Sequence, residues 1–154
     1  SVLGHSYGST TTSYAMKDVR PGVVENYGVM GSPGLAGKAE DMHVPEGHSY
    51  AMGFRDPFKR TSGSIFNNYD PMNAVDDALP KAYNFLFRGE DPLDSSWAPL
   101  GIDPTDSSSG FKLLDPGQVK VPENQSSVNP HSAYLVKESQ AQGELAKVIL
   151  GKAG

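Results

Sequence analysis

The side chains that usually build a protein core are scarce in this sequence. Leu, Ile, Val and Phe together make up 32 of the 154 residues, or about a fifth, and chains below that fraction tend not to fold alone. Gly and Pro supply another 29 residues, and ordering each loop residue costs roughly 1–2 kcal/mol of conformational entropy. We therefore predict a mostly irregular and extended chain with few short helices, little regular sheet and no independent globular core.

A short motif recurs along the chain. Residues 47–54 read Gly-His-Ser-Tyr-Ala-Met-Gly-Phe, residues 4–7 repeat positions 47–50, and residues 13–16 repeat positions 49–52. Residues 131–134, His-Ser-Ala-Tyr, are a fainter copy. Each copy carries an aromatic ring, and linked copies of a weak motif gain affinity for a repeating partner through avidity. We interpret the copies as extended pieces that occupy equivalent pockets on a larger assembly.

The first half of the chain shows no helical period. Aromatic and β-branched residues between 5 and 16 favour an edge strand or an extended arm. Glycine at every third position from Gly28 to Gly37 is typical of a polyproline-like run, which has three residues per turn. Residues 1–64 are therefore predicted to form an extended arm rich in aromatic residues and glycine.

Helical patterns are confined to the second half. Apolar residues spaced by three and four predict a short kinked helical region at 65–89, with helix near 71–88. Residues 90–129 are interpreted as a linker, because Asp-Pro pairs and serines dominate them. Residues 130–154 are predicted to form a C-terminal helix near 131–150.

Composition restricts the class of partner. The net charge is −5 and Lys and Arg are few, which argues against nucleic acid or an anionic membrane as a partner, because both attract clustered basic residues. No apolar run approaches the roughly 18 residues that span a bilayer. The absence of cysteine excludes disulfides and thiolate metal sites but leaves the compartment open. A first residue of serine fits either removal of an initiator Met or cleavage from a precursor.

Four side chains between positions 41 and 48 are the weak candidates for a metal site. Asp41, His43, Glu46 and His48 offer the oxygen and imidazole ligands that a metal such as zinc accepts. Their spacing matches no metal motif, and a polar loop with two exposed histidines explains them equally well. We expect no metal and no cofactor.

The serines and histidines are not assigned to catalysis. We expect no Gly-x-Ser-x-Gly turn of the kind that presents a catalytic serine. His131 opens the last predicted helix, so it is interpreted as a side chain of the cap region and not as a base. The chain is accordingly predicted not to be an enzyme.

Aromatic side chains with polar handles are favoured anchors at protein interfaces, and they are the candidate partner contacts here. Packing of the same rings into a small core of this chain is the alternative. The predicted contact residues are Tyr7, Tyr14, Tyr50, Phe54, Phe58, Trp97 and Tyr134.

These features together predict a non-enzymatic structural subunit that drapes over and cements larger globular subunits of a repeating assembly. A virion shell, as a minor capsid or decoration protein, is favoured slightly over a microtubule wall because cysteine is absent. The alternatives are a small self-folding α+β binding domain and a metal-dependent enzyme built on residues 41–48. The predicted partners are protein subunits, with no nucleic acid and no membrane, and the localisation beyond that assembly stays open.

Overall fold

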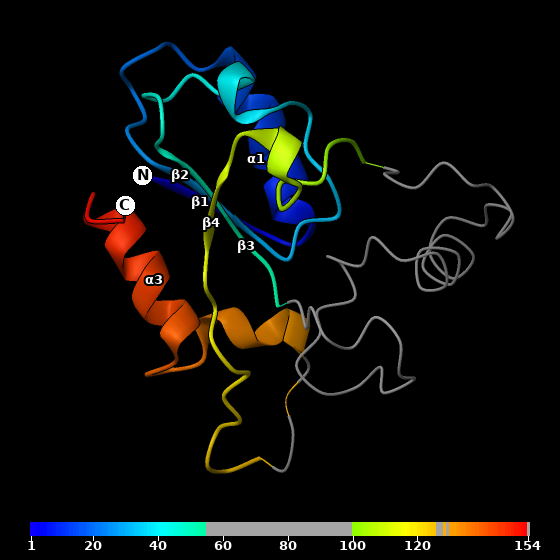
Figure 1. The fold of residues 1–154 in the computed structure, drawn as a ribbon, viewed down its shortest axis with the longest axis vertical. Coiled ribbons are helices and arrows are strands. Elements are labelled where there is room, and N and C mark those ends of the chain that lie inside the picture. The colour runs from blue at the N-terminus through cyan, green and yellow to red at the C-terminus, as the bar shows by residue number, and fades with distance from the viewer. Residues whose placement is uncertain (55–99, 126–127, 129, 154) are drawn as a thin grey trace, which may run out of the picture.

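A parallel β-sheet lies at the centre of the structure (Figure 1). The computed structural model describes residues 1–54, 100–125, 128 and 130–153, and within them four strands pair in the order β1-β2-β3-β4. The strands are β1 (Val2–His5), β2 (Tyr27–Met30), β3 (Ser49–Met52) and β4 (Lys112–Leu114). Each neighbouring pair is parallel.

The register of the sheet brings the carboxyl ends of the strands to one edge. Val2 lies opposite Tyr27, Tyr27 opposite Ser49, and Tyr50 opposite Lys112. In open parallel sheets, ligands bind in the crevice outside the carboxyl ends of the strands. The segments that follow the four strands are therefore where a functional site is expected.

Helices cover both faces of the sheet (Figure 1). Helix α1 (Tyr7–Asp18) packs on one face and helix α3 (Gln140–Ile149) on the other. Three short 3-10 helices complete the described elements: η1 (Ala39–Asp41), η3 (Ser107–Ser109) and η4 (Pro130–Leu135). None of the described helices has the length and apolar character needed to cross a bilayer.

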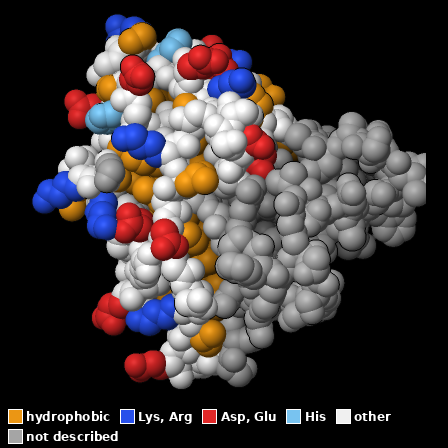
Figure 2. Space-filling view, viewed as in Figure 1, with side chains coloured by type: hydrophobic (Ala, Val, Ile, Leu, Met, Phe, Trp, Pro, Cys, Tyr) orange, Lys and Arg blue, Asp and Glu red, His pale blue; other side chains and the backbone are white. Residues whose placement is uncertain are grey.

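Alternation along the strands produces two buried clusters, because successive side chains of a strand point to opposite faces. The cluster under α1 consists of Met16, Val24, Tyr27, Val29, Leu35, Met42, Ala51 and Phe111. The cluster on the α3 side consists of Met30, Met52, Phe54, Ala133, Tyr134, Ala141 and Leu145. On the surface view of Figure 2, acidic and basic side chains are interspersed, with apolar side chains between them.

Buried hydroxyl groups attach α1 to the loop that follows β2. The Thr10 hydroxyl donates to the Gly34 carbonyl at 2.7 Å, and the Ser13 hydroxyl accepts from the Ala36 amide at 2.9 Å. Ser9 Oγ and Ser32 Oγ are 2.7 Å apart. This helix therefore docks through a polar face whose hydroxyls are satisfied by the loop, which offsets the cost of burying them.

The predicted fold class is wrong. An α/β fold with four parallel strands, flanking helices and a compact core replaces the expected irregular chain. Residues 5–16, expected to be extended, form the end of β1 and most of α1. The composition argument failed because Met, Tyr and Ala supply many of the core residues, and it counted only Leu, Ile, Val and Phe.

The predicted helical regions have different outcomes. The region at 65–89 lies outside the described residues, and so do residues 90–99 of the predicted 90–129 linker. The helix expected near 131–150 is present as two pieces, η4 and α3. Glu138 lies between them in a left-handed conformation, with φ 59°. The Ser139 side chain caps α3 by accepting from the Gln142 amide.

Tyr27 makes stability sensitive to alkaline pH. Its ring is fully buried, and burial raises the pKa of Tyr27 from 10.0 to about 12, although the hydrogen bond with Thr12 lowers it in part. Between pH 10 and 12 the unfolded chain gives up this proton and the folded chain keeps it. The stabilisation is therefore complete below pH 10 and is lost as the pH rises towards 12, by about 2–3 kcal/mol in total.

Urea unfolding at pH 9, 10 and 11 measures this loss. We expect Tyr27→Phe to flatten the decline relative to the wild type, whereas Tyr14→Phe, at an exposed position, should leave it unchanged. An identical decline in wild type and Tyr27→Phe would show that other groups cause it.

Candidate active site

Ser6 occupies a sharp turn between β1 and α1. Its φ and ψ are 54° and −133°, in a region that residues other than glycine rarely adopt. Such a conformation costs on the order of 1–3 kcal/mol and persists only where the surroundings impose it. Here the Ser6 amide donates to the Met30 carbonyl at 3.0 Å, and the Ser6 carbonyl accepts from the Ser9 amide at 2.9 Å. The turn is therefore held through both the amide and the carbonyl of Ser6.

Glycine at position 4 lets the helix approach the strand at this turn. A Cβ on Gly4 would lie 2.6 Å from Ser9 Cα and 2.6 Å from Thr12 Oγ1, both in α1. A Cβ on Gly8 would meet no atom within 4 Å. Gly4 is thus required by close packing, while Gly8 has space around it.

The His131 ring reaches the Ser6 side chain. His131 lies in η4, 125 residues further along the chain, and its Nε2 is 2.8 Å from Ser6 Oγ. Both residues are partly exposed. When the His131 hydrogen is on Nδ1, Nε2 accepts from the Ser6 hydroxyl, and this is the relation between a nucleophilic serine and its general base.

A comparison with protein families gave a match, and it includes the turn at Ser6. The family model of an alpha/beta hydrolase matches residues 1–62. Gly4-His5-Ser6-Tyr7-Gly8 is a Gly-x-Ser-x-Gly sequence, which in that fold places the nucleophile on a strained strand-to-helix turn. Neither the comparison with curated proteins nor the comparison with solved structures gave a match.

The match contradicts the predicted function. A non-enzymatic subunit that cements a virion shell or a microtubule wall is wrong, and so is the prediction that the chain is not an enzyme, because the matched family indicates a hydrolase. The expectation of no Gly-x-Ser-x-Gly turn was also wrong. Residues 4–8 contain that sequence, but they were interpreted only as half of a repeated motif.

The amino end of α1 points at the same site. Tyr7 is the first helical residue after Ser6, and amides of the first turn lack an acceptor within the helix. The residue after the nucleophile supplies one oxyanion-hole donor in alpha/beta hydrolases. In this chain the residue after Ser6 is Tyr7, whose amide lies at the positive end of the helix dipole.

Tyr134 and Phe54 connect η4 to the carboxyl end of β3. The Phe54 amide donates to the Tyr134 hydroxyl at 3.2 Å, and the two ring centroids are 4.7 Å apart. Tyr134 is 1% exposed and Phe54 2%. This contact helps to place the 3-10 helix that carries His131 beside the end of the sheet, where η4 is seen in Figure 1.

The predicted partner contacts fall into three groups. Tyr50, Phe54 and Tyr134 are buried inside this chain. Tyr7 and Tyr14 are exposed on α1, and their contact with a partner stays a prediction. Phe58 and Trp97 lie outside the described residues.

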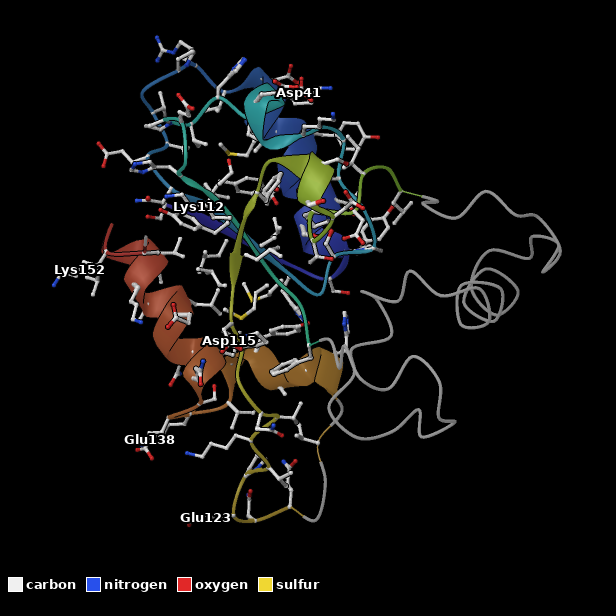
Figure 3. The ribbon with its side chains drawn as sticks, in the orientation of Figure 1. Asp41, Lys112, Asp115, Glu123, Glu138 and Lys152 are labelled. Carbon is white, nitrogen blue, oxygen red and sulfur yellow. The ribbon has the colours of Figure 1, made fainter. Side chains whose placement is uncertain are left out.

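The weak metal candidates do not converge on one point. Figure 3 shows Asp41 on η1, at the far end of the molecule from η4. Its carboxylate accepts from the Lys38 amide, His43 bonds to the Val19 carbonyl, and His48 bonds to the Asn26 side chain. The described part of the chain, which includes Glu46, contains no group of three His, Cys, Asp or Glu side chains that could hold a metal ion.

Proposed function

We propose that this chain carries the nucleophile and the general base of a serine hydrolase that cleaves carboxylic esters or related acyl bonds. The observation that carries the proposal is the 2.8 Å contact between Ser6 Oγ and His131 Nε2, made by a serine with φ 54° at the end of a strand. The family match to residues 1–62 supports the same reaction class.

Each of these groups has a role in the proposed reaction. Ser6 Oγ attacks the acyl carbon while its proton moves to His131 Nε2, and the Tyr7 amide stabilises the negative charge on the carbonyl oxygen. His131 then protonates the leaving group, and the acyl group stays on Ser6. A water molecule, deprotonated by His131, attacks this acyl-enzyme and releases the acid, and the proton returns to Ser6.

A third residue of such a site is a carboxylate that orients the histidine, and it is expected between Ser6 and His131 in the sequence. The triad order in alpha/beta hydrolases is Ser, then Asp or Glu, then His. Asp103 already accepts from the amide and hydroxyl of Thr105 in its own loop. Asp56 follows the end of β3 by four positions in the sequence and lies outside the described residues. Because of this place in the chain, Asp56→Asn is the first substitution to assay for a carboxylate that orients His131.

Covalent labelling tests the proposal. A fluorophosphonate reacts with serines activated by a neighbouring base, so we expect one label per chain, located on Ser6 by peptide mass spectrometry. Ser6→Ala should abolish it. Ser49→Ala is the matched control, because Ser49 stands in the same Gly-His-Ser-Tyr sequence but lies in β3. Absence of label on Ser6, under conditions that label an authentic serine hydrolase, would refute the proposal.

A further inference from the structure

We infer that His5 is a positioning residue for the general base, because its imidazole holds the main chain of His131 so that the His131 ring meets Ser6. This inference rests on the proposed function. It concerns a side chain that the reaction steps above do not use.

The His5 side chain has one hydrogen bond and two ring contacts with residues of η4. Its Nε2 is 2.7 Å from the His131 carbonyl oxygen. Because a carbonyl only accepts, Nε2 must carry the hydrogen. The His5 ring centroid lies 4.9 Å from that of His131 and 5.7 Å from that of Tyr134. One donor and two ring contacts therefore join the end of β1 to the helix that carries the base.

The short helix needs such an anchor. Six residues of 3-10 helix have poorer internal hydrogen bonds than an α-helix, and η4 does not belong to the sheet. A misplacement of about 1 Å between reacting groups can lower a rate by 10²-fold. The Tyr134–Phe54 contact fixes η4 three residues beyond the base, whereas the His5 bond is made to the main chain of His131 itself.

His5 and Ser6 are neighbours in the sequence, and this couples the position of the serine to that of His131. His5 is the last residue of β1, and Ser6 is the next residue. The strand end that presents the nucleophile therefore also holds the main chain of its base. Two consecutive residues fix both partners of the 2.8 Å contact, so small shifts of the sheet move them together.

Two substitutions separate the donor from the ring. His5→Phe keeps an aromatic ring beside His131 and Tyr134 but removes the N–H. His5→Gln keeps an N–H donor. With p-nitrophenyl butyrate as substrate, we expect His5→Phe to lower kcat by roughly tenfold with KM within about twofold, and His5→Gln to recover most of the loss.

A matched control tests the bond in a different place. His43 bonds through a ring nitrogen to the Val19 carbonyl, also at 2.7 Å, beyond the carboxyl end of α1. Ser6 precedes the amino end of that helix, and twelve residues of helix extend about 18 Å. His43→Phe removes the same kind of bond, so we expect it to leave kcat within about twofold of the wild type.

Two further measurements distinguish positioning from a direct role. In a His131→Ala background, His5→Phe should have no additional effect, because no base is left to position. The pH dependence of kcat should keep its midpoint in His5→Phe. An equal tenfold loss in both backgrounds, or a displaced midpoint, would overturn the inference, since His5 would then act on the substrate or as the titrating group.

Failure of this inference can be told from failure of the proposed function. If wild-type Ser6 takes no fluorophosphonate label, the proposed function fails. Positioning is then still tested by the side-chain ¹⁵N spectrum of His131, recorded in wild type, His5→Phe and His5→Gln. Because His5→Phe keeps a ring beside His131 and removes only the N–H donor, His131 signals that shift in this variant support positioning. His131 signals that do not move in His5→Phe contradict it.

Discussion

Replacing His131 with alanine is expected to lower kcat for p-nitrophenyl butyrate by about 10⁴-fold, the largest effect of any substitution outside Ser6. The reason is geometric. Nε2 of His131 is 2.8 Å from Ser6 Oγ, and without it the serine keeps its proton and is a poor nucleophile. Initial rates measured over a hundredfold range of substrate check the loss.

The controls use two other histidines, His43 and His48, and the nucleophile. His43→Ala and His48→Ala should retain kcat within about twofold. Their rings bond to the Val19 carbonyl and the Asn26 side chain, away from the carboxyl edge of the sheet. Ser6→Ala combined with His131→Ala should be hardly worse than either alone, since groups that act as a unit lose their effect together. Circular dichroism verifies that each variant folds. A His131→Ala protein within tenfold of wild type would mean that another group is the base.

One tetrapeptide explains why local sequence could not predict the fold. Ser13-Tyr14-Ala15-Met16 lies in helix α1, whereas the identical Ser49-Tyr50-Ala51-Met52 is strand β3. In the helix Ser13 and Met16 are buried and the two residues between them are exposed; in the strand all four are buried. Tertiary packing decided both outcomes, so a repeat in sequence was not a repeat in structure.

The neighbouring motif shows what the sequence did contain. Gly4-His5-Ser6-Tyr7 is followed by Gly8, whereas the second copy continues into Ala51 and stays in a strand. That fifth residue completes the Gly-x-Ser-x-Gly pattern and was the available signal for Ser6. The position of His131 was not available, because 125 residues separate it from Ser6 and only the folded sheet brings η4 to that edge.

Substitution of the two motif glycines should have opposite effects on stability. Gly4→Ala places a Cβ 2.6 Å from Ser9 Cα, a backbone atom that cannot yield without moving α1. We expect the free energy of unfolding to fall by about 2–4 kcal/mol, and fluorophosphonate labelling to slow because the Ser9 amide and the Ser6 carbonyl separate. Gly8→Ala meets no atom within 4 Å and should be neutral or stabilising by up to about 1 kcal/mol, since alanine favours helix.

Urea denaturation of both variants beside the wild type measures the contrast, and a Gly4→Ala chain too unstable to purify is an extreme of the same result. The two variants show whether both glycines of the motif are required by packing, or only Gly4. If both glycines served the turn equally, both variants would lose stability. The structure instead assigns the requirement to Gly4, because β1 and α1 cross at that position, and leaves Gly8 facing open space at the first turn of the helix. A loss in Gly8→Ala as large as that in Gly4→Ala would show that this crossing is not what constrains the turn that presents Ser6.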